Sequence, residues 1–329
     1  MTSSADDPRL AGWRERATSR TREAVAVIAS VPGVAGVIVG GSVARDEHWP
    51  LSDIDLIVIA EPHPASDIAE RVDRAAYQVS ELWGTSGIYT AVDAGRLTFS
   101  SAEVRRLAVG DAHATAAELH DHRMMHGIDK AYGGTVAHDP TGAARSMLDW
   151  ANRDRFSDPV ARARVAFWSQ TFTAAATDAE RLTASDESGA WIAVRRAGAA
   201  LAEIALEQRG LRTGSLGRFW TRFERLMAAS GGAPVAAHIV AACRAQPGPM
   251  PSDLPEWLAG RITLSLAARR LVGEDVTEEQ NVRDTLLAYA GLYRSRFPYH
   301  DVPWAQPNAD PDLPAALAAL RDLHPKLMA

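Results

Sequence analysis

Two aspartates separated by one residue are the side chains of this chain most able to do chemistry. Asp53 and Asp55 lie within residues 52–58, where apolar and polar residues alternate as in a β-strand. Every second side chain of a strand points to the same face, so both carboxylates share one face, about 6–7 Å apart along the backbone. Oxygen ligands at this spacing suit one or two Mg²⁺ ions, which keep room for water and phosphate groups. The pair predicts metal-assisted chemistry at a phosphate.

A glycine turn precedes these aspartates. Residues 37–39 form a short apolar run that ends at Gly40 and Gly41, which is typical of a buried strand followed by a backbone-permissive turn. Ser42 follows as the expected N-cap of a short helix, so the amides of residues 42–44 would point outward as orphan donors. Such a helix start attracts anions. We therefore expect a phosphate-binding turn opposite the acidic pair; the alternative is an edge strand whose aspartates only face solvent.

The stretch GGSVARDEHWPLSDIDLIV, residues 40–58, resembles the signature of the polymerase-beta-type nucleotidyltransferase superfamily. In that signature a glycine pair or Gly-Ser is followed, after roughly ten residues, by two acids separated by one apolar residue. The stretch looks most like the minimal branch and the aminoglycoside and other antibiotic-modifying branch, which Arg45 and Ser52 also match. The resemblance extends over residues 30–60 and is weak elsewhere.

The resemblance implies a fold, a donor and a set of roles. It implies an α+β fold, in which a small mixed-sheet nucleotidyltransferase core is followed by an all-helical bundle domain. It also implies ATP as the usual donor and two Mg²⁺ ions held by Asp53 and Asp55. Nucleotide binding would fall to the residues of the turn and the helix after it: Gly40, Gly41, Ser42 and Arg45. An arginine one turn into a helix is otherwise typical of a surface.

A third acid stands on the next strand in this superfamily. Residues 88–93 are mostly apolar or β-branched and end at Asp93. The resemblance makes Asp93 a metal ligand or the base that takes the proton of the acceptor hydroxyl. Residues 94–96 read Ala-Gly-Arg, and Asp-Ala-Gly is equally typical of a hairpin turn. Both interpretations of Asp93 stay open, and Glu81 is the alternative acid.

Histidines gather in residues 111–127: His113, His120, His122 and His126. The i,i+4 spacing of His122 and His126 can bind Zn²⁺, but the glutamate of an HExxH motif and a third ligand are both missing from the sequence nearby. A solvated helix face is the preferred interpretation. Arg123 or Lys130 could meet a triphosphate, although we expect Lys130 to be an ordinary surface lysine.

Composition limits the class of protein. The chain has 329 residues, of which 47% are hydrophobic and 23% charged, as in a globular protein of two domains. The net charge of −6 disfavours nucleic acid as a partner. Cys243 is the single cysteine, which excludes an internal disulfide and fits a reducing cytoplasm. The polar N-terminus predicts no secretory signal, and no apolar run is long enough to predict a membrane span.

The strongest boundary signal lies between Gly133 and Pro140. We expect a catalytic domain over residues 1–139 and a helical acceptor-binding domain over residues 140–329. In the first domain, helices are expected from Pro8 to before Pro32 and over residues 65–77. Apolar stripes at helical spacing predict a bundle beyond the boundary, with helices over residues 165–176, 191–204, 216–229, 234–245, 255–271 and 276–297 and a short one through Leu317 and Leu320.

These features together predict Mg²⁺-dependent transfer of a nucleoside monophosphate, AMP from ATP in the first instance, to a hydroxyl of a small, antibiotic-like molecule. The alternative is a regulatory or toxin–antitoxin-type enzyme that modifies a protein or RNA. A binding protein without catalytic activity is disfavoured, because both aspartates are intact.

Overall fold

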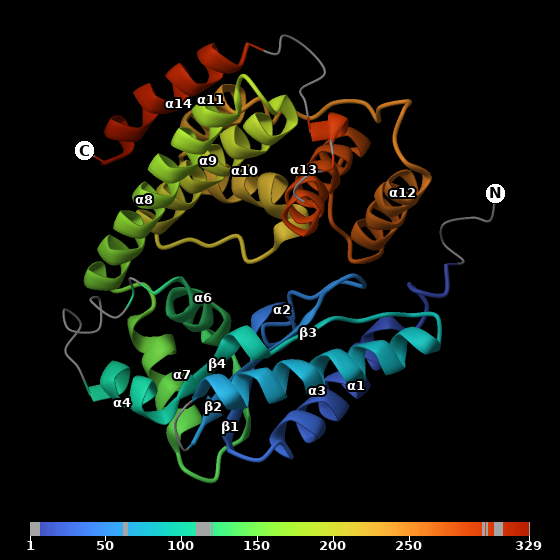
Figure 1. Cartoon of the computed structure of the whole chain (residues 1–329), viewed down its shortest axis with the longest axis vertical. Coiled ribbons are helices and arrows are strands. Elements are labelled where there is room, and N and C mark those ends of the chain that lie inside the picture. Colours follow the sequence, from blue (N-terminus) through green and yellow to red (C-terminus); the bar gives the residue numbers. More distant parts are fainter. Residues whose placement is uncertain are drawn as a thin grey trace. The chain divides into compact units, whose positions relative to one another are not determined.

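The chain folds into two compact units, residues 1–163 and 164–329 (Figure 1). The computed structural model describes residues 7–61, 65–109, 119, 121–297, 300, 302–305 and 312–328. The first unit contains a mixed β-sheet with helices on both faces, and the second is built from helices. This order confirms the predicted α+β class. Of the described helices, none is long and apolar enough to cross a membrane.

The sheet of the first unit is organised around its second strand. Its strands are β1 (Val34–Val39), β2 (Ile54–Ala60), β3 (Val92–Asp93), β4 (Thr98–Ser100) and β5 (Thr135–His138). β1 lies between β2 and β5 and is antiparallel to both, whereas β3 and β4 each pair with β2 in parallel. β2 is buried along its whole length. A strand covered on both faces reads as an apolar run, and Asp55 interrupts that run.

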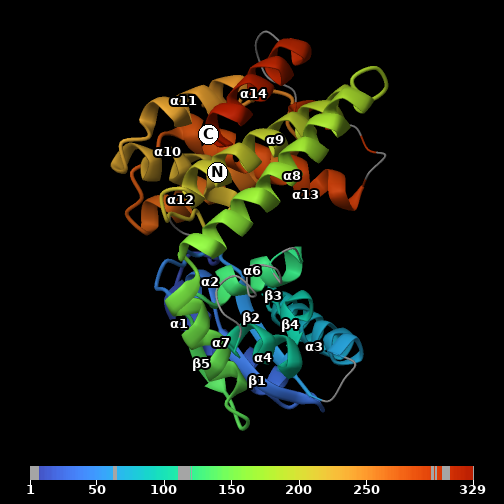
Figure 2. The ribbon, with the colours of Figure 1, turned by 90° about the vertical axis from the view of Figure 1, so that its left-hand side faces the viewer.

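Helices cover both faces of this sheet (Figure 2). On one face α1 (Trp13–Ala29) and α3 (Ala65–Thr85) pack over Leu56 and Val58. On the other, α4 (Ser101–Val109), α6 (His122–Ala131) and α7 (Ala143–Asp154) pack over Ile57 and Ile59. Side chains alternate along a strand, so Asp55 is on the same side as Ile57 and Ile59. That side is the one covered by α6.

The third strand is shorter than expected. Residues 88–91 are not in a strand, and β3 contains only Val92 and Asp93. The 3₁₀ turn η2 (Gly95–Leu97) follows and leads into β4. A Cβ at Gly95 would lie 2.4 Å from the Cβ of Asp73 on α3, so the turn packs closely on that helix. The chain therefore leaves the sheet edge directly after Asp93. Ser100 caps α4, since Ser100 and Glu103 exchange backbone and side-chain hydrogen bonds.

The first unit continues beyond the expected boundary at residues 139 and 140. β5 was not predicted; it adds a strand to the free edge of β1. α7 then packs on β1, where a Cβ at Gly36 would lie 2.9 Å from the Cβ of Ala144. Val160, in the first turn of α8 (Asp158–Leu182), belongs to the same core. A segment rich in glycine and proline thus contributes to the core of the first unit. The sequence pattern did not reveal this, because the residues that the segment packs against are distant from it in the sequence.

The helices of the second unit follow the apolar stripes of the sequence closely. After α8 they are α9 (Glu187–Glu207), η3 (Leu216–Arg218), α10 (Phe219–Ala229), α11 (Ala233–Ala242), α12 (Glu256–Leu271), α13 (Glu278–Arg296), η4 (Pro303–Ala305) and α14 (Leu313–Met328). The predicted helical second half is confirmed. α1 begins at Trp13 rather than Pro8, and α3 continues past residue 77 to Thr85.

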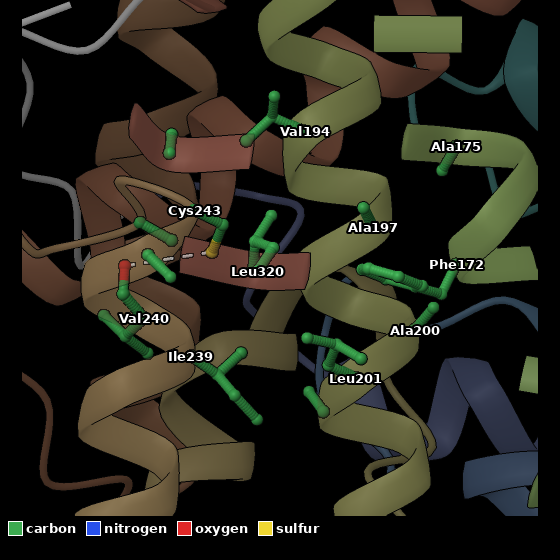
Figure 3. Close-up of a cluster of buried hydrophobic side chains, with 14 of the residues drawn as sticks. Phe172, Ala175, Val194, Ala197, Ala200, Leu201, Ile239, Val240, Cys243 and Leu320 are labelled. Atoms are coloured by element: carbon green, nitrogen blue, oxygen red, sulfur yellow. Dashed lines mark hydrogen bonds between the residues drawn. The ribbon is translucent and has the colours of Figure 1, made fainter. Parts of the chain in front are cut away.

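α9 lies at the centre of the second core. Figure 3 shows its Val194, Ala197 and Leu201 facing apolar side chains of α8, α11 and α14. A Cβ at Gly198 would lie 2.6 Å from the Cβ of Cys243, so the missing side chain allows close packing there. Burial raises the pKa of the Cys243 thiol to about 12, and its S–H contacts the carbonyl of Val240. Cys243 is therefore an inert core residue.

Candidate active site

Three carboxylates converge at one edge of the sheet. Asp53, Asp55 and Asp93 each offer an oxygen, and the three oxygens lie within 4.8 Å of one another. Asp53 and Asp55 share one face at the start of β2, and β3 places Asp93 beside Asp55 in the parallel register. Within the described ranges this is the one group of acids, histidines or cysteines close enough to bind a metal together. The structure therefore brings the three predicted acids together, whereas Glu81 is exposed on α3 and outside the group.

Asp55 is the buried member of this group, and its partner is Lys130 on α6. Only 1% of the Asp55 side chain is exposed. The Lys130 ammonium donates a hydrogen bond to Oδ2 at 2.9 Å and lies 2.8 Å from Oδ1. Burial, together with the charge of Asp53, raises the pKa of Asp55 to about 7, and Lys130 opposes this shift. Burial also acts to lower the pKa of Lys130, but Asp55 and Asp53 outweigh it, so that pKa is raised and the ammonium stays charged.

The expectation that Lys130 lies on the surface is wrong. Its side chain is 15% exposed because α6 covers the face of the sheet that carries Asp55. The sequence contained a weak signal for this residue: of the 35 basic residues, only Lys130 and Lys326 are lysines. A chain that uses arginine almost everywhere retains a lysine at this position.

The other two acids have different surroundings. Both carboxylate oxygens of Asp93 accept hydrogen bonds from Nε of Arg96 at 2.8 Å. This contact raises the pKa of Arg96. The carboxylate of Asp53, by contrast, has no hydrogen bond or ion pair with any residue that the structure describes. Arg96 was not predicted to be part of the site, and Lys130 was considered only as a possible contact of the triphosphate.

The donor set fits a hard divalent cation. Among the described residues three carboxylates meet two cationic side chains, Lys130 and Arg96, so the group retains negative charge. Oδ1 of Asp55 is buried, and the Lys130 ammonium lies 2.8 Å from it. A buried carboxylate has to be paired with a cation or to coordinate a metal ion. Carboxylate oxygens alone, without histidine or thiolate, suit Mg²⁺ or Mn²⁺ better than Zn²⁺.

Gly41 brings the turn close to these acids. Its φ is +62°, in the left-handed region that favours glycine. A Cβ there would lie 1.8 Å from Oδ2 of Asp55. Backbone conformation and contact thus both require glycine. Gly40 serves another purpose, because its amide donates to the carbonyl of Asp55 at 2.9 Å, and a Cβ on it would lie 2.4 Å from the carbonyl oxygen of Lys130.

The helix after the turn is short. α2 (Gly41–Ala44) has Gly40 as its N-cap, so the prediction of Ser42 as the cap is wrong. Ser42 is buried in the first turn, and its hydroxyl donates to Oγ of Ser52 at 3.2 Å. The first-turn amides of residues 41–43 donate to no carbonyl that the structure describes, as expected at a helix start. These amides belong to Gly41, which contacts Asp55, and to the two residues after it.

Arg45 fixes the position of α6. Its Nη1 donates to the carbonyl of Tyr132, the C-cap of α6, at 2.9 Å. Its side chain is 9% exposed, which contradicts the alternative of a surface arginine; its predicted contact with nucleotide stays a prediction. A Cβ at Gly133 would lie 2.9 Å from Cγ of Arg45, so the absence of a side chain at position 133 leaves room for Arg45. Arg45 therefore links α2 to the helix that carries Lys130.

His122 and His126 do not form a metal site with any described residue. The rings of His122 and His126 stack at a centroid distance of 6.1 Å, and no third ligand of the described chain joins them. Burial lowers the pKa of His126 to about 4, helped by the charges of Lys130 and Arg96. His126 is therefore neutral at pH 7. His113 and His120 lie outside the described residues.

A cavity of about 580 Å³ lies beside Arg96. Its lining includes Ser66 at the start of α3, Ser100 of β4, Glu103 of α4 and Arg123 of α6. Glu103 and Arg123 form an ion pair across it. Arg96 is thus shared between the acidic group and this cavity.

Part of this unit matches a known family. Residues 19–86 match the model of the family described as "Nucleotidyltransferase domain". The matched segment contains α1 from residue 19 onward, the glycine turn, Asp53, Asp55 and α3, and ends before Asp93 and Lys130. No curated protein matches the chain. The domain match supports a transferase and leaves the acceptor and the nucleotide to be determined.

Proposed function

We propose that the first unit transfers a nucleoside monophosphate from a nucleoside triphosphate to a hydroxyl group, with ATP as the donor. The observation that carries this proposal is the convergence of Asp53, Asp55 and Asp93 beside the Gly41 turn. Two of the three acids lie in the segment that matches the nucleotidyltransferase domain. No comparable group of ligands exists among the described residues of the second unit.

Asp53, Asp55 and Asp93 would hold two Mg²⁺ ions. When bound, these ions neutralise charge on the phosphate oxygens and lower the pKa of the acceptor hydroxyl. The amides of residues 41–43 and the hydroxyl of Ser42 are the proposed contacts of the terminal phosphates. Gly40 and Arg45 support them indirectly, because both hold α6 against the turn.

The reaction breaks one bond and forms one. The acceptor oxygen attacks the α-phosphorus, and the bond from that phosphorus to the oxygen bridging to the β-phosphate breaks. Pyrophosphate leaves with the electron pair of that bond. The hydroxyl proton passes to a carboxylate, for which Asp93 is the candidate because it stands at the edge of the sheet. Arg96, bound to both oxygens of Asp93, would hold this carboxylate in position.

The acceptor we propose is a small hydroxyl compound of the antibiotic kind, selected with the help of the helical unit. The size of that unit supports this choice, since residues 164–329 form a compact body of their own. The net charge of −6 suits a cationic acceptor better than a nucleic acid. Modification of a protein or RNA is the competing outcome of the test below.

The test is transfer of label from α-phosphate-labelled ATP in the presence of Mg²⁺. Separate panels of aminoglycosides and other small molecules, purified proteins and tRNA serve as acceptors, and the other nucleoside triphosphates compete with ATP. We expect label on a small molecule with the wild-type protein and a loss of about a thousandfold or more for Asp53→Asn and Asp55→Asn, since each removes a metal ligand.

Asp46→Asn is the matched control for these variants. Asp46 lies in the same loop, its side chain is 82% exposed, and its φ of 54° is a conformation that asparagine tolerates. This variant should keep full activity. An absence of ATP binding and of transfer to every panel would refute the enzyme proposal, whereas label on protein or tRNA alone would refute the small-molecule acceptor.

A further inference from the structure

The position of Lys130 is determined by contacts that do not involve its ammonium. Its carbonyl oxygen packs where Gly40 has no side chain. The carbonyl of Tyr132, two residues later, accepts the hydrogen bond from Arg45. Asp129, one residue earlier, accepts hydrogen bonds from Arg155, whose side chain is fully buried. The last turn of α6 is therefore fixed against the glycine turn whether or not the ammonium binds Asp55.

The ammonium now occupies the oxygens that a metal ion would need. Lys130 lies within 2.9 Å of both carboxylate oxygens of Asp55. A divalent cation on Asp55 would compete with it for those oxygens, and the two positive charges would repel each other strongly in a buried site. The four-carbon stem of lysine can carry its charge to another acceptor nearby without movement of the helix. An arginine fork would bind both carboxylate oxygens at once and move less readily.

We propose that Lys130 is the resident counter-ion of the acidic group and a positioning residue for phosphate. In the metal-free protein its ammonium neutralises Asp55; when divalent cation and nucleotide bind, it leaves Asp55 and pairs with an oxygen of the triphosphate. This inference rests on the proposed function, because it needs a nucleotide beside Asp55. It explains why the chain keeps one of its two lysines in a nearly buried position.

The two lysines make a direct test possible. A short pulse of an amine-acetylating reagent, followed by peptide mass spectrometry, measures the reactivity of Lys130, with Lys326 as the internal reference. Lys326 also pairs with an aspartate, Asp322, but its side chain is 65% exposed. We expect slow acetylation of Lys130 in the metal-free protein and acetylation about tenfold faster with saturating Mn²⁺. A non-hydrolysable ATP analogue added with Mn²⁺ should restore slow acetylation, and Lys326 should respond to neither.

Metal affinity gives a second, independent readout. Lys130→Gln removes the competing charge, so we expect its Kd for Mn²⁺ to fall about tenfold, or about 1.4 kcal/mol. The titration is done at about pH 8.5, where a proton competes less for Asp55. Lys326→Gln, the matched control, should bind Mn²⁺ as the wild type does. Lys130→Arg should keep the stability of the metal-free protein but bind the ATP analogue more weakly. If Lys130 were only a structural cation, arginine would replace it fully and the affinity for the analogue would not change.

The outcomes separate the two proposals. A wild-type protein that binds neither Mn²⁺ nor the ATP analogue would overturn the proposed function. A wild-type protein that binds both, while Lys130 acetylation ignores them and the Lys130→Gln variant has an unchanged Kd, would overturn only the role of Lys130. Because the acetylation test uses the wild-type protein, it remains decisive even if a variant fails to fold.

Discussion

At the scale of single residues, Gly41 and Asp55 form the contact on which the site depends. Two requirements coincide at Gly41, namely a positive φ and the close approach of a carboxylate oxygen. Each could be met separately elsewhere in the chain. Gly12, for example, has a φ of +58° but no atom within 4 Å of the position of a Cβ. A comparison of substitutions at Gly41 and Gly12 therefore separates the effect of backbone strain from the effect of a disturbed site.

Gly41→Ala should therefore be compared with Gly12→Ala. Both variants force alanine into the left-handed region, which costs about 1–2 kcal/mol of stability. Only Gly41→Ala also drives a methyl group into Asp55, so only this variant should lose Mn²⁺ binding and nucleotidyl transfer. Thermal denaturation and Mn²⁺ titration measure the two effects. Equal metal affinity in the two variants would show that the contact with Asp55 is unimportant.

At the scale of elements, α6 holds the site together. The helix covers the face of β2 that carries Asp55, and it is tied to α2 through Arg45. One turn before Lys130, His126 lies in the same layer with Nε2 buried and without a hydrogen-bond partner in the described chain. A neutral imidazole is tolerated there, whereas a charged one is not.

The stability of the protein should consequently fall in mild acid because of His126. Its pKa is about 4 in the folded state, below the ordinary value of 6.5, so the unfolded chain binds the proton more readily. The contribution of the neutral ring is complete above about pH 6.5 and is lost as the pH falls toward 4. Up to about 3 kcal/mol is at stake. Urea denaturation between these pH values should show this slope in the wild type and not in His126→Gln.

His122→Gln is the control, because His122 lies one turn earlier on the exposed side of α6. It should keep the pH dependence of the wild type. If both variants keep the slope, another group is responsible for acid denaturation.

At the scale of the whole molecule, the acidic group and the helical bundle belong to two units with separate hydrophobic cores. All ligands of the acidic group, with Lys130 and Arg96, belong to residues 1–163, whereas α9 organises the core of residues 164–329. Leu201 is fully buried in that second core. Damage to it should affect the helical unit and leave the metal ligands in place.

Leu201→Ala tests this division. Removing the side chain leaves a cavity and should cost about 2–5 kcal/mol of stability, visible as a lower midpoint of thermal unfolding of the helices. Below that midpoint the Kd for Mn²⁺ should equal that of the wild type, because no metal ligand has moved. A variant that stays helical yet binds Mn²⁺ much more weakly would show that the second unit contributes to the metal site.

The local sequence pattern was sufficient to predict a large part of the structure of this protein. The glycine turn, the alternation of Asp53 and Asp55, and the helices of the second half depend on neighbouring residues, so spacing along the chain revealed them. The short strand β5 and the extent of the first unit escaped notice, because four residues between glycine and proline are too few to show a period. The cap of α2 was misplaced by two residues, since Gly40 and Ser42 both suit a helix start.

The amino-acid sequence by itself determined which acids could bind a metal and that a glycine turn precedes them. Only the tertiary structure decided that Asp93 joins them, because the parallel register of β2 and β3 is set by packing rather than by spacing. The same holds for Lys130, which lies 75 residues from Asp55 in the chain. A contact over that distance depends on how α6 lies against the sheet, and an ammonium is predicted to be exposed until a buried carboxylate is placed opposite it.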